Sequence, residues 1–117
     1  MDVNEVTSNI IGAAVDVHRE LGPGLLESSY EECMVFELKV RGMAVERQRH
    51  LPLTYKGMRL KCGYRLDLVV NEAVIVELKT VEQLDPIHTA TVLTYLKISG
   101  LRVALLINFN VPLLKHG

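Results

Sequence analysis

Tryptophan is absent from the sequence, and only 5% of its 117 residues are aromatic. Positive charge is also scarce, since 13 lysines and arginines face 14 aspartates and glutamates and leave a formal net charge of −1. A dedicated nucleic-acid binder usually has aromatic side chains for stacking and a broad excess of positive charge. The composition therefore excludes such a binder, and any contact with nucleic acid must be local.

Long hydrophobic runs and paired cysteines are missing too. The apolar run at residues 103–107 is far shorter than the roughly 20 residues that a membrane-spanning helix needs. The acidic start lacks the basic and apolar regions of a signal peptide, so we expect a cytoplasmic protein without membrane contact. Cys33 and Cys62 have no C-x-x-C pairing and no histidines at ligand spacing, which favours reduced buried thiols over a zinc site.

The hydrophobic fraction of 49% and the charged fraction of 23% are typical of a globular chain. A chain of this length can enclose one hydrophobic core but has no room for a second domain of typical size. The sequence contains no internal repeat, linker or low-complexity stretch. We therefore expect residues 1–117 to form a single domain.

Apolar spacing predicts helices over residues 3–21 and 25–41, and Asp85-Pro86 predicts the start of a third helix that ends near Ser99. Four strands are expected between the second and third helices, joined as an antiparallel meander: 44–49, 51–55, 60–70 and 73–79. Residues 103–109 predict a last strand buried on both faces. The order α-α-β-β-β-β-α-β indicates an α/β fold with a mixed sheet flanked by helices.

The hairpin of residues 64–79 is the most informative segment. A two-residue turn would put charge into the core, whereas a three-residue loop at 71–73 places Asp67 directly opposite Glu77. In that register one face is apolar and comprises Leu66, Leu68, Val70, Val74, Val76 and Leu78. The other face comprises Arg65, Asp67, Glu77 and Lys79, with Val69 and Ile75 near the turn.

Two carboxylates directly across a strand pair repel each other, so the arrangement needs a nearby cation. Lys79 could be that cation, and so could Mg²⁺ or Mn²⁺, which prefer hard oxygen ligands. A lysine beside such a metal is placed to stabilise a phosphate. The competing interpretation is a solvated ion cluster on an open sheet face. Val69 and Ile75 interrupt the polar face and favour a cleft instead.

The second helix adds further acidic groups. Glu27 and Glu31 are four residues apart and share one helix face, with Glu27 in the first turn, where the helix dipole favours a carboxylate. Stabilisation of the helix end explains Glu27 equally well. Tyr30 could donate a hydrogen bond toward the site, but packing in the core is the favoured interpretation.

Together these segments resemble the GxxExxY family, a branch of the PD-(D/E)xK nuclease superfamily. The naming motif is present as Gly24-Leu25-Leu26-Glu27-Ser28-Ser29-Tyr30. Similar segments in the same order are Val17-His18-Arg19-Glu20-Leu21-Gly22-Pro23, Tyr64-Arg65-Leu66-Asp67, Val76-Glu77-Leu78-Lys79, Tyr95-Leu96-Lys97 and Leu106-Ile107-Asn108-Phe109. The resemblance spans nearly the whole chain.

This resemblance implies a restriction-endonuclease-like core and metal-dependent hydrolysis of nucleic-acid phosphodiester bonds. Asp67 and Glu77, together with Leu78, would bind Mg²⁺ or Mn²⁺. Lys79 would activate water or stabilise the charge that develops on the phosphate, and Glu27 would help to hold the metal or its water. The resemblance also suggests four residues that contact substrate: Tyr30, Arg65, Thr91 and Tyr95.

The implied substrate is DNA in preference to RNA, and the low net charge predicts that a homodimer or a partner protein completes the binding groove. One departure concerns Thr91, because similar proteins usually carry glutamine there and threonine lacks the paired donor and acceptor of an amide. His88 lies one helical turn earlier and could take a polar role, although a helix end or the surface is the favoured interpretation; the same ambiguity applies to His18. Two alternatives remain open: a non-catalytic nucleic-acid or protein interaction module, and a structural subunit of a homo-oligomer.

Overall fold

The computed structural model describes residues 1–61 and 63–117, so the prediction of a buried thiol at Cys62 lies outside the described residues. The helices are α1 (Val3–Leu21), α2 (Glu27–Val40), α3 (Pro86–Ser99) and the short 3-10 helix η1 (Leu114–His116). The strands are β1 (Val45–Leu51), β2 (Thr54–Tyr55), β3 (Met58–Arg59), β4 (Tyr64–Val70), β5 (Val74–Lys79) and β6 (Val103–Asn108). No described helix is long and apolar enough to span a membrane.

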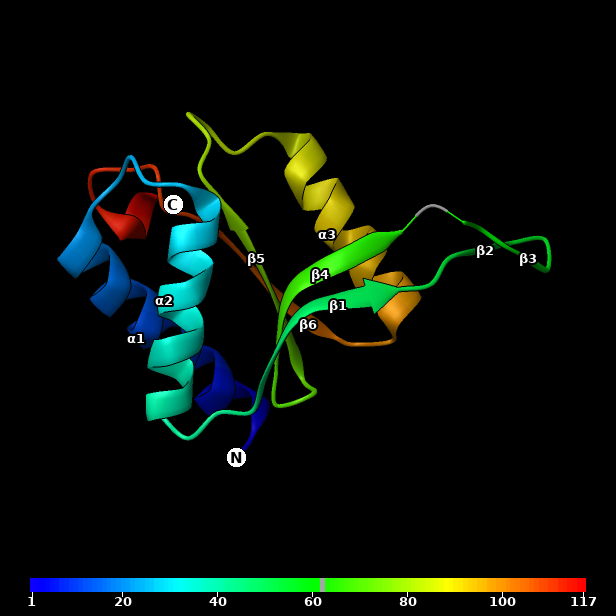
Figure 1. Ribbon diagram of the computed structural model, residues 1–117, viewed down its shortest axis with the longest axis horizontal. Coiled ribbons are helices and arrows are strands. Elements are labelled where there is room, and N and C mark those ends of the chain that lie inside the picture. The colour runs from blue at the N-terminus through cyan, green and yellow to red at the C-terminus, as the bar shows by residue number, and fades with distance from the viewer. Residues whose placement is uncertain (62) are drawn as a thin grey trace.

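Four strands form a mixed sheet in the order β1-β4-β5-β6. β4 is antiparallel to both β1 and β5, whereas β6 is parallel to β5. The parallel pair is possible because α3 makes the crossover between β5 and β6. α1 and α2 lie on one side of the sheet and α3 on the other (Figure 1). This α/β arrangement confirms the predicted class and is consistent with a restriction-endonuclease-like core.

The predicted meander is wrong at its second strand. Leu51 ends β1, which pairs directly with β4, and β2 pairs with β3 in a separate hairpin that projects from the sheet (Figure 1). Pro52 follows β1 and lacks the N–H that a continuous ladder would use. Lys56 and Gly57 have φ of 48° and 80°, as in a tight type I′ turn. This hairpin therefore forms a local structure of its own.

Helix ends follow local hydrogen bonding. The Asp2 carboxylate accepts a hydrogen bond from the Glu5 N–H at 2.9 Å and so caps the first turn of α1. Pro86 occupies the first turn of α3, and the Asp85 N–H donates to Nδ1 of His88 at 2.9 Å. His88 is therefore a helix-end residue, which confirms the favoured interpretation. His18 is buried, with Nε2 2.8 Å from the Val111 carbonyl oxygen, and it ties the C-terminal segment to α1.

Two hydrophobic cores lie on the two sides of the sheet. The first joins α1 and α2 to the sheet through residues such as Ile10, Met34, Leu38, Leu68 and Val76. The second is smaller and packs sheet residues against α3 and the segment that follows it. β6 is an edge strand, so residues 103–106 are only half-buried and the expectation of burial on both faces is wrong.

One side chain departs from the predicted alternation in β4. Leu68 and Val70 face the first core as expected, but Leu66 packs with Val69 in the second core. β1 shows the same reversal, because Val45 packs on the first core and Leu51 in the second. Both reversals centre on Gln48 and Asp67, which lie between the ladder pairs Arg47–Leu68 and Arg49–Leu66. The ribbon of β1 and β4 therefore turns over at this pair.

Candidate functional site

β4 and β5 separate where the predicted acidic residues begin. Their ladder pairs Val70 with Val74 and ends at the pair Leu68–Val76, which confirms the register of the three-residue loop. Beyond that pair β4 continues beside β1, while β5 continues beside β6 up to Lys79. We call the gap between the diverging strands the fork. Asp67 and Glu77 are the first residues of the fork.

Each carboxylate of the fork accepts a backbone N–H from the opposite strand. The Asp67 N–H donates to Oε1 of Glu77 at 3.0 Å, and the Leu78 N–H donates to Oδ2 of Asp67 at 2.9 Å. These bonds replace ladder bonds that the diverging strands no longer form, and they hold the two side chains in place. The N–H and C=O of a strand residue point to the same side, so the Leu78 carbonyl also faces the fork.

Negative charge is concentrated in this gap. Glu77 is only 5% exposed, and burial together with the neighbouring Asp67 raises its pKa to about 8, although Lys79 opposes the shift. Glu27, the first residue of α2, also has a raised pKa because of partial burial and the charge of Asp67. Lys79 lowers the pKa of both glutamates. The structure thus brings Glu27, Asp67, Glu77 and Lys79 into one electrostatic neighbourhood.

The segment before α2 orients Glu27. Gly24 has φ of 96°, a conformation that favours glycine. The Tyr30 hydroxyl donates to the Gly22 carbonyl at 2.5 Å and accepts the Leu25 N–H at 3.2 Å. The Tyr30 ring is 0% exposed and stacks on Phe109, which confirms the interpretation as core packing. A fully buried ring cannot reach a substrate, so the expected substrate contact of Tyr30 is not supported.

One polar residue near the fork, Gln48, was missed from the sequence, and it contacts Glu31, which shares a helix face with Glu27 as predicted. Gln48 donates from Nε2 to Oε1 of Glu31 at 2.5 Å and lies 3.4 Å from Oδ1 of Asp67. Glu31 is 8% exposed and also pairs with Arg47 at 2.9 Å. Gln48 has φ of 49°, which is uncommon for a residue other than glycine. The one signal in the sequence was its position beside Asp67 in the sheet, which required knowing that β1 pairs with β4.

The remaining predicted substrate residues lie on α3 and β4. Thr91 and Tyr95 help to line a cavity of about 190 Å³ that also includes Tyr64. Burial raises the pKa of Tyr95, and the negative charges of Glu77 and Asp67 add to the shift, so its hydroxyl lies near the fork. The Thr91 hydroxyl donates to the Ile87 carbonyl within its own helix at 2.9 Å. Arg65 is exposed on β4.

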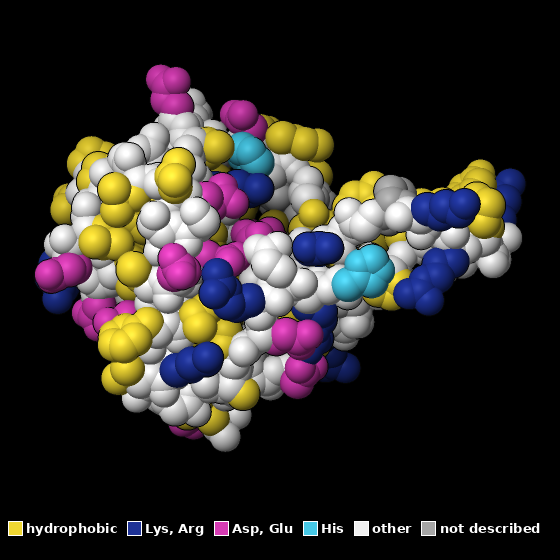
Figure 2. All heavy atoms as spheres, in the orientation of Figure 1, with side chains coloured by type: hydrophobic (Ala, Val, Ile, Leu, Met, Phe, Trp, Pro, Cys, Tyr) yellow, Lys and Arg dark blue, Asp and Glu magenta, His cyan; other side chains and the backbone are white. Residues whose placement is uncertain are grey.

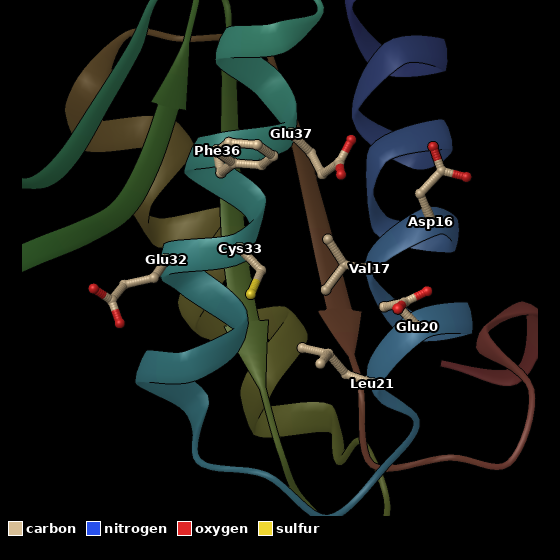
Figure 3. Close-up of a pocket in the computed structure, with 8 residues that line it drawn as sticks. All are labelled: Asp16, Val17, Glu20, Leu21, Glu32, Cys33, Phe36 and Glu37. Carbon is tan, nitrogen blue, oxygen red and sulfur yellow. The ribbon is translucent and has the colours of Figure 1, made fainter.

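A second hollow lies away from the fork, between α1 and α2 (Figure 3). Its volume is about 390 Å³. Four apolar or sulfur-bearing side chains and four carboxylates line it: Val17, Leu21, Cys33, Phe36, Asp16, Glu20, Glu32 and Glu37. We call it the acidic groove. Cys33 is a free thiol as predicted, but it is half-buried in this groove instead of enclosed in the core.

The donors of the fork fit a hard divalent cation. Within the described residues, no three side chains of His, Cys, Asp or Glu converge as a complete metal cage. The fork instead offers two carboxylates and a backbone carbonyl, and Oε2 of Glu77 accepts none of the hydrogen bonds found in the described part of the chain. One or two carboxylates with water and carbonyl oxygens are typical ligands of Mg²⁺ and Mn²⁺.

Residues 4–117 match the family model of the PD-(D/E)XK nuclease superfamily. The match covers nearly the whole chain, so the chain belongs to this superfamily, which confirms the recognition from sequence at that level. No curated protein and no solved structure matches the chain. Membership indicates a nuclease-type function with a nucleic-acid substrate, and nucleases of this superfamily are generally dependent on a divalent metal.

Proposed function

We propose that the chain is a metal-dependent nuclease and that the fork is its active site. The observation that supports this most directly is the pair of carboxylates, Asp67 and Glu77, held side by side by backbone N–H groups in spite of their repulsion. Structural stability alone would favour apolar residues at the end of a ladder, because buried like charges oppose folding. A bound cation removes that repulsion and gives the pair a role.

The residues then divide the work of hydrolysis. Asp67, Glu77 and the Leu78 carbonyl would hold Mg²⁺ or Mn²⁺, which when bound supplies Lewis-acid activation of water and of the phosphate. Lys79 projects from the same end of β5, where its ammonium offers a positive charge to the pentavalent phosphate of the transition state. Glu27 orients water at the mouth of the fork, and Gln48 fixes Asp67 through its amide.

Three finer assignments belong to this proposal. We place the chain in the GxxExxY branch because of the segment Gly24–Tyr30. In this segment Gly24 adopts a positive φ, Glu27 supplies a carboxylate, and the Tyr30 hydroxyl donates a hydrogen bond to the loop before α2. We propose DNA in preference to RNA as the substrate, with Arg65, Thr91 and Tyr95 beside it. We also propose that residues 1–117 form one domain that acts in the cytoplasm, as a homodimer or with a partner protein.

Metal binding tests the proposal without knowledge of the substrate. Mn²⁺ should bind the wild-type chain in calorimetry at neutral pH and should not bind Asp67→Asn, which keeps an oxygen for the Leu78 N–H. Glu82→Gln is the matched control, since Glu82 is an exposed carboxylate outside the fork. Cleavage of linear DNA should then require Mn²⁺ and be abolished in Asp67→Asn. A wild-type chain that binds no Mn²⁺ would remove the active site as proposed.

A second candidate function rests on Thr91, whose hydroxyl already donates a hydrogen bond to the Ile87 carbonyl within α3. Without a free amide at this position, the chain could be a non-catalytic module that binds nucleic acid or protein and retains the nuclease fold. Gln48 weakens this alternative, because it brings an amide to Asp67 from β1. The module predicts nucleic-acid binding that is unchanged by Asp67→Asn, together with no cleavage by any preparation of the wild type.

A further inference from the structure

Positive charge is unevenly distributed along the chain. Between residues 47 and 66 the sequence has six of its 13 lysines and arginines and none of its 14 aspartates and glutamates. The remainder therefore has seven cations against 14 acids. The net charge of −1 hides this division. A local field can attract a polyanion even when the whole molecule is nearly neutral.

Three cations of this segment lie close together without ion-pair partners among the described residues. Arg47 and Arg49 are paired with Glu31, Glu46 and Glu72. Lys56, Arg59 and Lys61 are exposed and form no ion pair with any acid in the described part of the chain. These three belong to the β2–β3 hairpin and its flanks, residues 52–61, which we call the basic arm. Figure 2 shows lysine and arginine side chains gathered along this projection.

The shape of the basic arm is well defined. Thr54 pairs with Arg59 and Tyr55 with Met58 across the tight turn. The Lys56 ammonium lies 5.5 Å from the centre of the Tyr55 ring, so a cation covers one face of this ring. Stacking of unpaired bases on Tyr55 is therefore disfavoured. A two-stranded ribbon of this kind has the width that the major groove of duplex DNA admits.

The basic arm also leaves the sheet at the appropriate end. It connects β1 to the start of β4, and because β4 is antiparallel to β5, the arm leaves the sheet on the side toward which the fork opens, where β5 ends at Lys79. Gly57 and Asp67 are ten positions apart, so the tip lies at most about 36 Å from the fork. That reach corresponds to about ten base pairs of a duplex, each of which rises about 3.4 Å.

We infer that the basic arm binds the phosphate backbone of duplex DNA within about one helical turn of the fork. Its cations attract the duplex to a chain whose remaining surface is acidic, and the turn holds them in a fixed geometry. This inference rests on the proposed function for its nucleic-acid partner, but it concerns affinity and is independent of cleavage.

Fluorescence anisotropy with a labelled 20-base-pair duplex in EDTA tests the inference, because no metal is present to support cleavage. The arm variant is Lys56→Gln with Arg59→Gln and Lys61→Gln. The matched control is Lys39→Gln with Lys97→Gln and Lys115→Gln, three exposed lysines elsewhere that give the same change in net charge. We expect the arm variant to bind about 10–100-fold more weakly and to reduce the salt slope by about 0.9 for each phosphate that the arm no longer neutralises.

The control should bind close to wild type, and an 8-base-pair duplex should also bind the wild type more tightly than the arm variant, because the cations of the arm attract it as well. Equal decreases in affinity in the arm variant and the control would overturn the inference, because net charge would then explain binding. It would also be overturned if the wild type did not bind the duplex, or if the arm variant changed only self-association in sedimentation, as expected for an arm that enters the acidic groove of a second copy. Loss of Mn²⁺ binding or cleavage, with the arm effect intact, would instead contradict the proposed active site alone.

Discussion

In the fork, the buried carboxylate of Glu77 lies beside the half-buried carboxylate of Asp67, whereas in the basic arm three cations extend into solvent. Solvent screens the cations of the arm, so their mutual repulsion is weak. Burial prevents such screening at Glu77, and its raised pKa reflects the unfavourable environment of the ionised carboxylate. We therefore expect the fork to destabilise the metal-free fold and the arm to have little effect on it. Substitutions in the two regions should therefore act on different properties.

The largest expected effect separates chemistry from binding. Lys79→Ala should lower the rate of Mn²⁺-dependent cleavage by about 10²–10³-fold, because it removes a positive charge from the transition state. Duplex affinity in EDTA should change little, since the cations of the basic arm remain. Single-turnover cleavage and anisotropy measure the two quantities. Lys97→Ala, an exposed lysine on α3, is the control, and equal decreases of rate in both variants would contradict the role of Lys79.

The second effect concerns the stability of the metal-free fold. The pKa of Glu77 is about 8 in the folded chain, above its usual value of 4.5, so the folded state binds the proton more tightly. Stability should therefore fall as the pH rises from about 4.5 to 8. Glu77→Gln cannot ionise, so at pH 9 it should increase the free energy of unfolding by roughly 1–3 kcal/mol, with little change at pH 4.

Urea unfolding in EDTA at the two pH values checks this prediction. Glu82→Gln serves as the control, since its carboxylate is exposed and should respond weakly at both pH values. If Glu77→Gln were less stable than the wild type at pH 9, the prediction would be contradicted, because the ionised carboxylate would then stabilise the fork. Saturating Mn²⁺ should make the wild type more stable than Glu77→Gln, because the metal compensates the charge of the wild type only.

The fork shows how far the sequence could predict this protein. The loop at residues 71–73 and the opposition of Asp67 and Glu77 followed from alternation, because a slip of one residue would bury charge. Leu66 was misplaced because alternation assumes a regular ribbon, and the ribbon turns over at Gln48 and Asp67. Glutamine has no marked preference for positive φ, so no local sequence signal predicted the reversal of the ribbon at Gln48.

The basic arm was not predicted from the sequence, for a different reason. Residues 51–55 have strand-like composition, and only the long-range pairing of β1 with β4 excludes β2 and β3 from the sheet. The positive charge of the arm was also overlooked, because the net charge was taken over the whole chain. Helices were predicted closely, since apolar spacing and the Asp85-Pro86 pair are signals that act within a few residues. Local signals thus predicted local structure, while the features that distinguish fork from arm depend on distant pairing.

A third and smaller effect compares two residues in the left-handed conformation, one in each region. Gln48 and Lys56 have φ of 49° and 48°. Asparagine tolerates this conformation better, so Gln48→Asn and Lys56→Asn should each stabilise the backbone by about 0.5–1 kcal/mol. Only Gln48→Asn should weaken Mn²⁺ binding, by about tenfold, because its shorter amide cannot bridge Glu31 and Asp67. Calorimetry on both variants checks the difference, and equal Mn²⁺ affinities would contradict the positioning role of Gln48.

The smallest effect tests whether the acidic groove opposes the basic arm. The groove lies between α1 and α2, toward the opposite end of a molecule 46 Å long (Figure 1). Charges separated by several Debye lengths, each about 10 Å at 0.1 M salt, interact weakly through solvent. Glu20→Gln with Glu37→Gln should therefore raise duplex affinity by less than about twofold at 0.1 M salt, and by more at 0.01 M, where the Debye length is about 30 Å. An increase as large as the decrease in the arm variant would mean that the duplex passes over the helical side of the molecule, because only direct proximity to the phosphates could give two glutamates that much influence.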